Sequence, residues 1–221
     1  MKAPNVSWSR YLRNGAGRRL SQLGERLGQQ WLIYNRFVMR QFHDEALFNA
    51  PLVVPALMTM FSNTRTVLDV GAGSGAFAAE FQRRGVRAIA LERSSHGLAL
   101  ARKQGVDARK FDLIHTPPVA VGEKADLVYS FEVAEHMPPF LGDALIKFLA
   151  GFRCPVVFSA AHPNQGGTGH INEQPREYWI QKFAAHGFTE ASARSEELRG
   201  QLTTAGASRW FQTNPFVTFP S

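Results

Sequence analysis

The run from Val67 to Gly75, which reads VLDVGAGSG, constrains the fold of this chain more than any other stretch of its sequence. An apolar segment with a carboxylate, Asp69, leads into a turn that carries Gly71, Gly73 and Gly75. Glycines let a backbone approach a ligand closely, and the N-terminus of a helix offers free N–H groups. The run therefore predicts a strand-to-helix turn that holds a nucleotide-like cofactor at the carboxyl end of a parallel sheet.

The acid before the glycines indicates which cofactor this is. The spacing Gly71-x-Gly73-x-x-Ala76 also fits the loose dinucleotide fingerprint, so the glycines alone decide little. A carboxylate at Asp69 would repel a pyrophosphate but attract the cationic amino group or sulfonium of S-adenosylmethionine (SAM). With Ala72 inside the turn, the string Asp-x-Gly-x-Gly-x-Gly resembles the first motif of class I SAM-dependent methyltransferases. A dinucleotide site and a glycine-rich turn without a ligand stay open as alternatives.

Two further acids follow strands in the expected places. Glu92 ends the apolar stretch 86–92, about 20 residues after the glycines, where a carboxylate accepts both hydroxyls of a ribose. Arg93 follows it and is expected to stack on or flank the adenine. The resemblance implies that Asp112 accepts the adenine amine and that Leu113 lies against the ring. The alternatives are a surface glutamate at 92 and a plain strand-ending aspartate at 112.

The stretch 125–138 is expected to form the fourth strand and the loop that carries the chemistry. Phe131 and Glu132 at its turn are expected to contact the cofactor. The sequence Glu132-Val-Ala-Glu135-His136 resembles the fourth motif of small-molecule O-methyltransferases, including those of ubiquinone biosynthesis. His136, with an ordinary pKa of about 6.5, is the expected general base, and Glu132 and Glu135 orient it or serve as base themselves.

The same residues permit a divalent cation. Positions 132, 135 and 136 are spaced i, i+3 and i+4, which predicts one face of a helical turn. Glu132, Glu135 and His136, with His162 or His170 as a fourth ligand, would form such a site. Small-RNA 2′-O-methyltransferases and some catechol-type methyltransferases are similar here. A metal-free catalytic role and a purely structural helix start remain alternatives.

The loop after the fifth strand is polar and glycine-rich, and it is expected to face the methyl acceptor. Its candidate hydrogen-bonding groups are His162, Gln165, His170 and Asn172. This segment resembles bacterial methyltransferases of biosynthetic clusters. The expected function is methyl transfer to a small polar acceptor at oxygen, with His136, Glu135 and His170 as catalytic residues. The alternatives are an RNA 2′-O-methyltransferase, an N-methyltransferase of an amino sugar or another small amine, and a non-catalytic SAM-binding partner protein.

The positive charge is concentrated in residues 1–40. That segment holds eight basic side chains and one acid, whereas the remaining chain holds 17 of each sign, so the first 40 residues carry the net charge of +7. An apolar period there predicts one helix face that packs on the core or caps the active site. Its members are Leu20, Leu23, Leu27, Trp31, Tyr34 and Val38. Alternatively, the segment binds anionic lipid, RNA or a carrier protein.

The order of expected elements predicts an α/β fold: a Rossmann-like three-layer sandwich with a seven-stranded, mostly parallel sheet. Residues 1–62 would form a basic helical extension, and residues 63–221 the methyltransferase domain. A helix over 42–62 is expected to break near Pro51 and Pro55. The family resemblance implies an antiparallel last strand within 209–219, next to a strand at 189–195. The other strands are expected at 66–70, 86–92, 109–113, 125–131 and 155–161, and helices at 76–84, 96–104, 139–152 and 175–186.

Composition limits location and assembly. No run of about 18 apolar residues exists, so no membrane span is expected. The single cysteine, Cys154, cannot form an internal disulfide, which favours a reducing cytoplasm. The balanced charge beyond residue 40 argues against a broad nucleic-acid track, although residues 1–40 leave nucleic acid possible. The sequence fits a monomer or a homodimer equally well.

Overall fold

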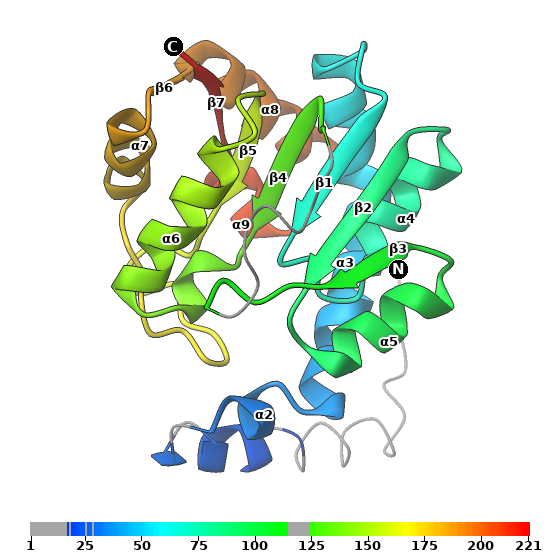
Figure 1. Ribbon diagram of the computed structural model, residues 1–221, viewed down its shortest axis with the longest axis vertical. Coiled ribbons are helices and arrows are strands. Elements are labelled where there is room, and N and C mark those ends of the chain that lie inside the picture. The colour runs from blue at the N-terminus through cyan, green and yellow to red at the C-terminus, as the bar shows by residue number, and fades with distance from the viewer. Residues whose placement is uncertain (1–16, 18, 25, 28, 115–123) are drawn as a thin grey trace.

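The computed structural model describes residues 17–221 except 18, 25, 28 and 115–123, and the described strands form one seven-stranded sheet (Figure 1). The strand order is β3-β2-β1-β4-β5-β7-β6. The five strands β1 to β5 pair in parallel, and β7 runs antiparallel to both β5 and β6. The strands are β1 (Thr66–Val70), β2 (Arg87–Glu92), β3 (Asp107–Lys110), β4 (Leu127–Phe131), β5 (Val156–Ser159), β6 (Phe188–Glu190) and β7 (Phe216–Pro220).

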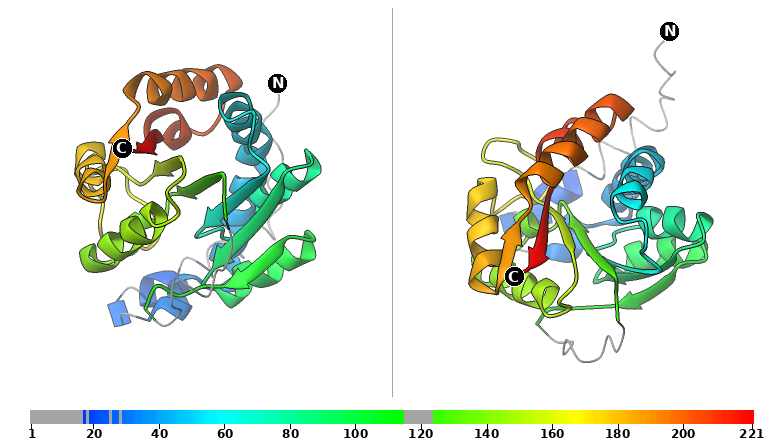
Figure 2. Two further views of the ribbon diagram at one scale, coloured as in Figure 1. Left: turned by 45° about the horizontal axis from the view of Figure 1, so that its top comes forward. Right: turned by 90° about the horizontal axis from the view of Figure 1, so that it is seen from above.

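Helices cover both faces of this sheet, which confirms the expected three-layer architecture (Figure 2). Alternate strand residues face opposite sides, so one core packs under α3, α4, α5, α8 and α9, and the other under α6 and α7. The helices are α2 (Gln30–Ile33), α3 (Arg36–Met60), α4 (Ala76–Arg83), α5 (Ser95–Lys103), η2 (Ala134–His136), α6 (Pro139–Ala150), α7 (Arg176–Ala185), α8 (Ser192–Ala205) and α9 (Arg209–Thr213).

Helix α3 is longer than expected and does not break. It starts at Arg36, where the Asn35 side chain accepts hydrogen bonds from the backbone N–H groups of residues 37 and 38. It then continues through Pro51 and Pro55 to Met60, so the predicted break is wrong. An internal proline costs a helix about 3 kcal/mol. The fully buried residues around the two prolines, Val53 and Val54 among them, offset that cost by packing against the sheet.

Three strand predictions need correction. The expected strand over 209–219 is a short helix, α9, followed by β7 from Phe216. Its neighbour β6 covers Phe188–Glu190, and most of the expected strand over 189–195 belongs to α8 instead. Helix α8 buries only Ser195, Leu198 and Leu202 in 14 residues, so its apolar period was too weak to recognise. The third strand ends at Lys110, before Asp112.

The N-terminal segment does not present one continuous apolar face. Residues 19–24 are helical, but the chain turns at Tyr34 and Asn35 before α3. Leu20, Leu23 and Leu27 are exposed, whereas Val38 is buried. The three leucines therefore do not pack on the core, whereas Tyr34, from the same predicted face, lines the cavity described below. Residues 1–16 of the predicted extension lie outside the described residues, as does the side chain of Trp31.

Two composition-based expectations can be compared with the described structure. Within the described residues, no helix is both long and apolar enough to cross a membrane. Cys154 is buried immediately before β5, and burial raises the pKa of its thiol to about 11. A thiol with such a high pKa is a poor nucleophile, which is consistent with a structural role.

Candidate functional site

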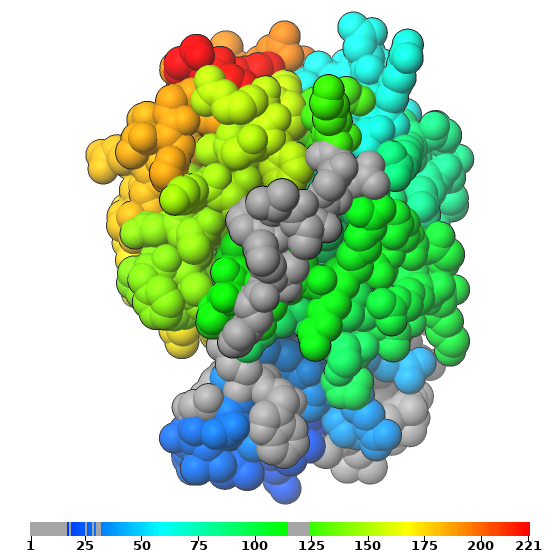
Figure 3. All heavy atoms as spheres, in the orientation of Figure 1, coloured from blue at the N-terminus to red at the C-terminus, as the bar shows by residue number. Residues whose placement is uncertain are grey.

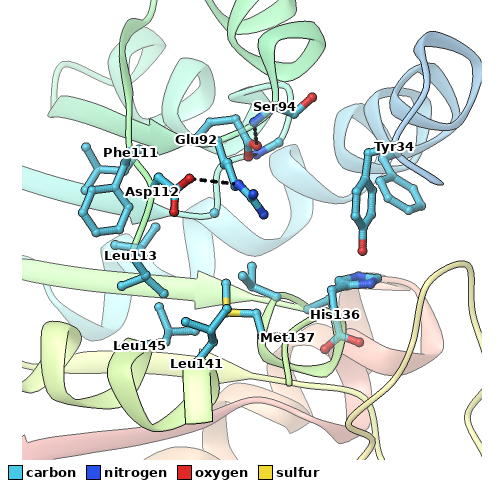
Figure 4. A pocket seen from close by; sticks show the side chains of 18 of the residues that line it. Tyr34, Glu92, Ser94, Phe111, Asp112, Leu113, His136, Met137, Leu141 and Leu145 are labelled. Atoms are coloured by element: carbon cyan, nitrogen blue, oxygen red, sulfur yellow. Dashed lines mark hydrogen bonds and ion pairs between the residues drawn. The ribbon is translucent and has the colours of Figure 1, made fainter. Parts of the chain in front are cut away.

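A cavity of about 450 Å³ lies at the carboxyl ends of β1, β2 and β4, where parallel α/β sheets usually bind ligands (Figure 4). The first part of α3 and the start of α6 enclose it from the two sides. Seven of the residues expected to hold the cofactor line it: Gly71, Gly73, Glu92, Arg93, Asp112, Leu113 and Glu132. Of the expected catalytic residues, His136 lines it.

Glu92 fastens the glycine turn to the end of β2. One carboxylate oxygen accepts a hydrogen bond from the Gly73 N–H at 2.7 Å, and the other accepts one from the Ser94 N–H at 2.6 Å. Ser94 caps α5 by accepting from the Gly97 N–H. Burial raises the pKa of Glu92, and the two N–H donors oppose that shift. Each oxygen keeps a lone pair for a ligand in the cavity.

Asp69 lies behind the glycine turn and does not line the cavity. It is only 4% exposed, and burial raises its pKa to about 8. The Tyr129 hydroxyl nearby opposes this shift, and the charge of Glu92 adds to it. Without a ligand, the Asp69 carboxyl is therefore mostly protonated at neutral pH.

Three other expected cofactor residues also lie outside the cavity lining. The Ala72 N–H donates to the Leu91 carbonyl, which joins the glycine turn to β2. A Cβ on Gly75 would lie 2.8 Å from the Ala101 Cβ, so this glycine allows α4 to start against α5. The ring of Phe131 packs against Tyr129 and against two phenylalanines. Ala72 and Gly75 thus shape the glycine turn, whereas Phe131 packs against the core.

One end of the cavity combines an ion pair with apolar side chains. The Arg93 Nε lies 3.1 Å from an Asp112 carboxylate oxygen. Asp112 follows β3 in a loop, where it also accepts from the Ile114 N–H. Phe111 and Leu113 line the wall on either side of it (Figure 4). This end offers polar groups at its edge and a flat apolar surface.

The expected helical turn of Glu132, Glu135 and His136 does not exist. Glu132 has a left-handed backbone with a φ of 53°, and η2 begins only at Ala134. The Glu132 carboxylate is directed toward the Asn214 side chain, and Gln165 also donates to it at 3.0 Å. A left-handed non-glycine residue is strained, and such residues cluster at functional sites. The three side chains therefore do not share one helical face, and that prediction is wrong.

Glu135 is fully buried beside the cavity. Burial raises its pKa well above the usual range, and the charge of Glu132 adds to this effect. Both side-chain oxygens are buried without a hydrogen bond to any described residue. The Glu135 backbone carbonyl accepts from the N–H groups of Ile171 and Asn172, so it anchors the loop after β5. Asn172 is thus held next to Glu135.

His136 faces the cavity with one nitrogen free to accept a proton. Its Nδ1 lies 3.3 Å from the Gly169 carbonyl oxygen. Because a carbonyl only accepts hydrogen bonds, Nδ1 carries the proton and Nε2 keeps a lone pair. Burial, assisted by the nearby His170, lowers the pKa of His136 to about 4. Its ring meets those of Tyr34 and His170 edge-on, at centroid distances of 5.6 and 4.9 Å.

The loop after β5 brings His170 to this place but not His162. The His170 Nδ1 lies 2.8 Å from a carboxylate oxygen of Glu173, whose pKa the imidazole lowers. Glu135, His136 and His170 each offer a ligand atom within 4.8 Å of the other two. Neither Glu132 nor His162 belongs to that group.

Tyr34, Met39 and Phe42 form the cavity wall contributed by the N-terminal part of α3 and the turn before it. Tyr34 belongs to the apolar face that was expected to pack on the core or cap the active site, whereas Met39 and Phe42 were not expected at the site. Asparagine is favoured at the N-cap of helices, so Asn35 could have indicated from the sequence that a helix starts there. Nothing in the sequence marked Asn214 as a partner of Glu132, because the contact joins distant segments.

The comparisons with known proteins agree with this architecture. A family model described as a methyltransferase domain matches residues 34–152. An O-methyltransferase family protein from Burkholderia thailandensis superposes with a TM-score of 0.64 at 17% identity, over 97% of this chain and 69% of that one. Magnesium protoporphyrin IX methyltransferase (ChlM) from Synechocystis, solved with bound SAM, superposes with a TM-score of 0.59 at 15% identity, over 99% of this chain and 100% of that one. At such identities, these structures show a shared fold.

Two curated relatives match shorter segments. An uncharacterized methyltransferase from Mycobacterium sp. (strain JLS) is 40% identical over 88 residues, which are 38% of this chain and 34% of the relative. Ribosomal RNA small subunit methyltransferase H from Gemmatimonas aurantiaca is 37% identical over 57 residues, 26% of this chain and 18% of the relative. The matches thus span about a third and a fifth of those relatives. Since the family model covers more than half of the chain, the protein belongs to the methyltransferase domain family, and its sheet has the fold of the solved methyltransferases.

Proposed function

We propose that this protein transfers a methyl group from SAM to a hydroxyl oxygen of a small polar metabolite or biosynthetic intermediate. The observation that carries the proposal is the state of His136: a neutral imidazole on the cavity wall, with Nδ1 held by the Gly169 carbonyl and Nε2 free. A hydroxyl acceptor must lose a proton as its oxygen becomes methylated, so a free base beside the cavity suits oxygen chemistry.

The cavity residues fit the cofactor. Glu92 would accept the ribose hydroxyls, and Gly73, where an added Cβ would meet nothing within 4 Å, leaves room for close approach of the cofactor. The Arg93–Asp112 pair and Leu113 offer a polar edge and an apolar face for adenine. When bound, SAM supplies a methyl group already activated by its sulfonium charge, so the protein's task is orientation and proton removal.

The acceptor end is formed by side chains around His136. Tyr34 and Phe42 enclose the imidazole, which restricts water and keeps the base neutral. Nε2 takes the proton of the acceptor hydroxyl. Glu135 is a fully buried neighbour, and His170 borders the imidazole edge-on. Together they fix the position of the base.

A divalent cation is a second route to the same reaction. Glu135, His136 and His170 converge within ligand distance of one another. Both imidazoles donate through Nδ1 to an oxygen, an arrangement that commonly orients histidine ligands. The unpartnered oxygens of Glu135 would then gain a ligand role. A cation held there would lower the pKa of the acceptor hydroxyl and replace His136 as the means of proton removal.

Three alternative functions remain, and they differ in the methyl acceptor or in the need for His136. The solved sugar N-methyltransferase KedS8 has the same fold, with a TM-score of 0.59 at 14% identity over 78% of this chain and 86% of that one. An amino sugar or another small amine is therefore the first alternative. An RNA 2′-O acceptor would rely on the basic residues 1–40 and would bind with steep salt dependence. A non-catalytic SAM-binding protein would lose nothing on substitution of His136.

The deciding experiment is a screen of hydroxyl, amine and RNA acceptors with methyl-labelled SAM, with and without EDTA. Under the proposal, a hydroxyl compound is labelled, and His136→Gln reduces kcat by about 100-fold or more. His186→Gln, an exposed histidine just after α7, is the matched control and keeps full activity. Full turnover in EDTA removes the cation, whereas loss of turnover supports it. Full activity of His136→Gln would overturn the assignment of the base.

The proposal includes a compartment and an oligomeric state. We place the protein in the cytoplasm because its single cysteine is free and buried. We propose a monomer or a homodimer, which sedimentation would distinguish.

A further inference from the structure

The N-terminal segment carries a row of exposed leucines. Leu20, Leu23 and Leu27 are 38%, 46% and 58% exposed. Their spacing of three and four residues places them on one side of the helical segment. A soluble protein rarely leaves large apolar side chains in a row without a use.

The leucines are held outward because a neighbouring side of the same segment is fixed to the body. Gly17, Ser21 and Gly24 are buried. A Cβ on Gly17 would lie 2.5 Å from the Phe37 Cβ, and one on Gly24 would lie 2.7 Å from the Ile33 nitrogen. Small residues thus make the close contacts, and no room remains to turn the leucines inward.

Asn35 holds this arrangement from the start of α3. Its side-chain amide donates to the Gly17 carbonyl at 3.1 Å and to the Leu32 carbonyl at 2.8 Å. The same side chain caps α3 through the N–H groups of residues 37 and 38. The orientation of the leucine row is therefore part of the folded structure.

Positive charge accompanies the leucines. Arg19 and Arg26 are exposed on the same segment. Residues 1–40 carry the whole net charge of +7, since the rest of the chain is balanced. Apolar side chains next to arginines, on a segment with one acid, match a surface that is both apolar and anionic.

We propose that residues 19–27 dock the protein on an anionic lipid surface. Leu20, Leu23 and Leu27 enter the boundary between headgroups and acyl chains, and Arg19 and Arg26 pair with lipid phosphates. RNA would satisfy the arginines but would leave the three leucines in water. A second copy of this chain would cover the leucines but would bring like charges together.

This docking places the cavity mouth at the lipid surface. The segment lies at the end of the molecule below the carboxyl ends of the strands (Figures 1 and 3). The chain runs directly from it through α2 to Tyr34, which lines the cavity. Two further exposed apolar side chains lie at the cavity: Ile114 lines it, and Phe140 lies between the lining residues Pro138 and Leu141.

Vesicle co-sedimentation of the full chain tests the proposal. The probes are phosphatidylcholine vesicles with and without phosphatidylglycerol, each at low and high salt. We expect binding to the anionic vesicles, weakened by salt. The variant Leu20→Gln, Leu23→Gln, Leu27→Gln should lose at least about tenfold in partitioning. The variant Arg19→Gln, Arg26→Gln should show a reduced preference for anionic vesicles, because six of the eight basic side chains in residues 1–40 remain.

The matched control is Leu47→Gln, Phe48→Gln. These side chains are 42% and 55% exposed on α3 but follow Asp44 and Glu45, so their environment is acidic. The control should bind vesicles as the unmodified protein does. Circular dichroism melting checks that each variant is folded. If the triple variant is unfolded, the single variant Leu27→Gln replaces it in the binding experiment. Vesicle binding that survives the leucine changes would overturn the proposal, as would leucine-dependent self-association or RNA binding without any binding to vesicles.

Discussion

The Glu132 carboxylate accepts hydrogen bonds from the side-chain amide of Asn214, although the two residues lie 82 positions apart in the chain. The same amide also donates to Gln165 at 2.9 Å. One asparagine therefore connects the loop after β4, the loop after β5 and the segment before β7. It holds Glu132 in a left-handed conformation at the edge of the cavity.

The first prediction concerns Asn214→Ala, which removes these bonds at once. The free energy of unfolding should fall by about 1–3 kcal/mol, because a charged acceptor loses its donor in a half-buried place. SAM affinity should also fall, since Glu132 lines the cavity. Urea denaturation and calorimetry measure the two effects. Gln201→Ala, which removes only an exposed contact with Glu197, is the control and should change stability by less than about 0.5 kcal/mol. Equal stability of the two variants would contradict the assigned role.

Glu92→Gln should weaken SAM binding by about 10-fold to 100-fold, equivalent to about 1.4–2.8 kcal/mol. The carboxylate accepts from two backbone N–H groups, and an amide offers one accepting oxygen and turns a donor toward the other N–H. The glycine turn and any ribose contact would both suffer. Asp107→Asn, an acid at the start of the neighbouring β3 that pairs with Arg109, should leave the affinity unchanged. Isothermal calorimetry with the two variants decides whether the effect belongs to Glu92.

The raised pKa of Asp69 predicts that the free energy of unfolding depends on pH. Its pKa in the folded protein is raised to about 8 from the ordinary 3.8, so the folded state keeps a proton that the unfolded chain releases. The contribution of Asp69 is therefore fully present below about pH 4 and is lost as the pH rises toward 8. Asp69→Asn should flatten this decline in Tm between pH 5 and 8, about the window in which Asp69 titrates. An unchanged slope in the variant would show that the buried carboxyl is not the cause.

The pH dependence of activity follows from His136. Its pKa of about 4 keeps the imidazole neutral across the physiological range. Protonation at lower pH removes the lone pair that accepts the hydroxyl proton, so kcat/KM should fall on an acid limb near pH 4 instead of near the usual 6.5. Rate profiles measured within the range of stable folding test this. An acid limb near 6.5 would mean that another group, or a differently solvated His136, sets the rate.

The fold was largely predictable from the sequence because its signals are local. The strand and turn at 66–76 combine apolar residues, an acid and glycines in a few positions, and β1 ends where expected. Helices α4, α5 and α6 also begin close to their expected starts. The failures have two causes: α3 continues through Pro51 and Pro55 because of tertiary packing, and α8 shows little apolar periodicity. Local preference was overruled in the first case and absent in the second.

The site was predictable only in part. Spacing after the glycines indicated Glu92 and Arg93, and the family resemblance indicated Asp112; all three line the cavity. The helical spacing of Glu132, Glu135 and His136 misled, because the left-handed backbone at Glu132 breaks the turn before it starts. Sequence periodicity assumes regular backbone, and strained residues violate that assumption.

The position of β7 between β5 and β6 has a consequence for assembly of the protein. Strand β6 has no neighbour in the described sheet except β7, so it joins the sheet only after a strand that the ribosome makes later. Until β7 is inserted, the backbone of β5 remains an open edge. A nascent chain that stalls before β7 emerges would therefore expose that edge to other unfinished chains, and aggregation would start there.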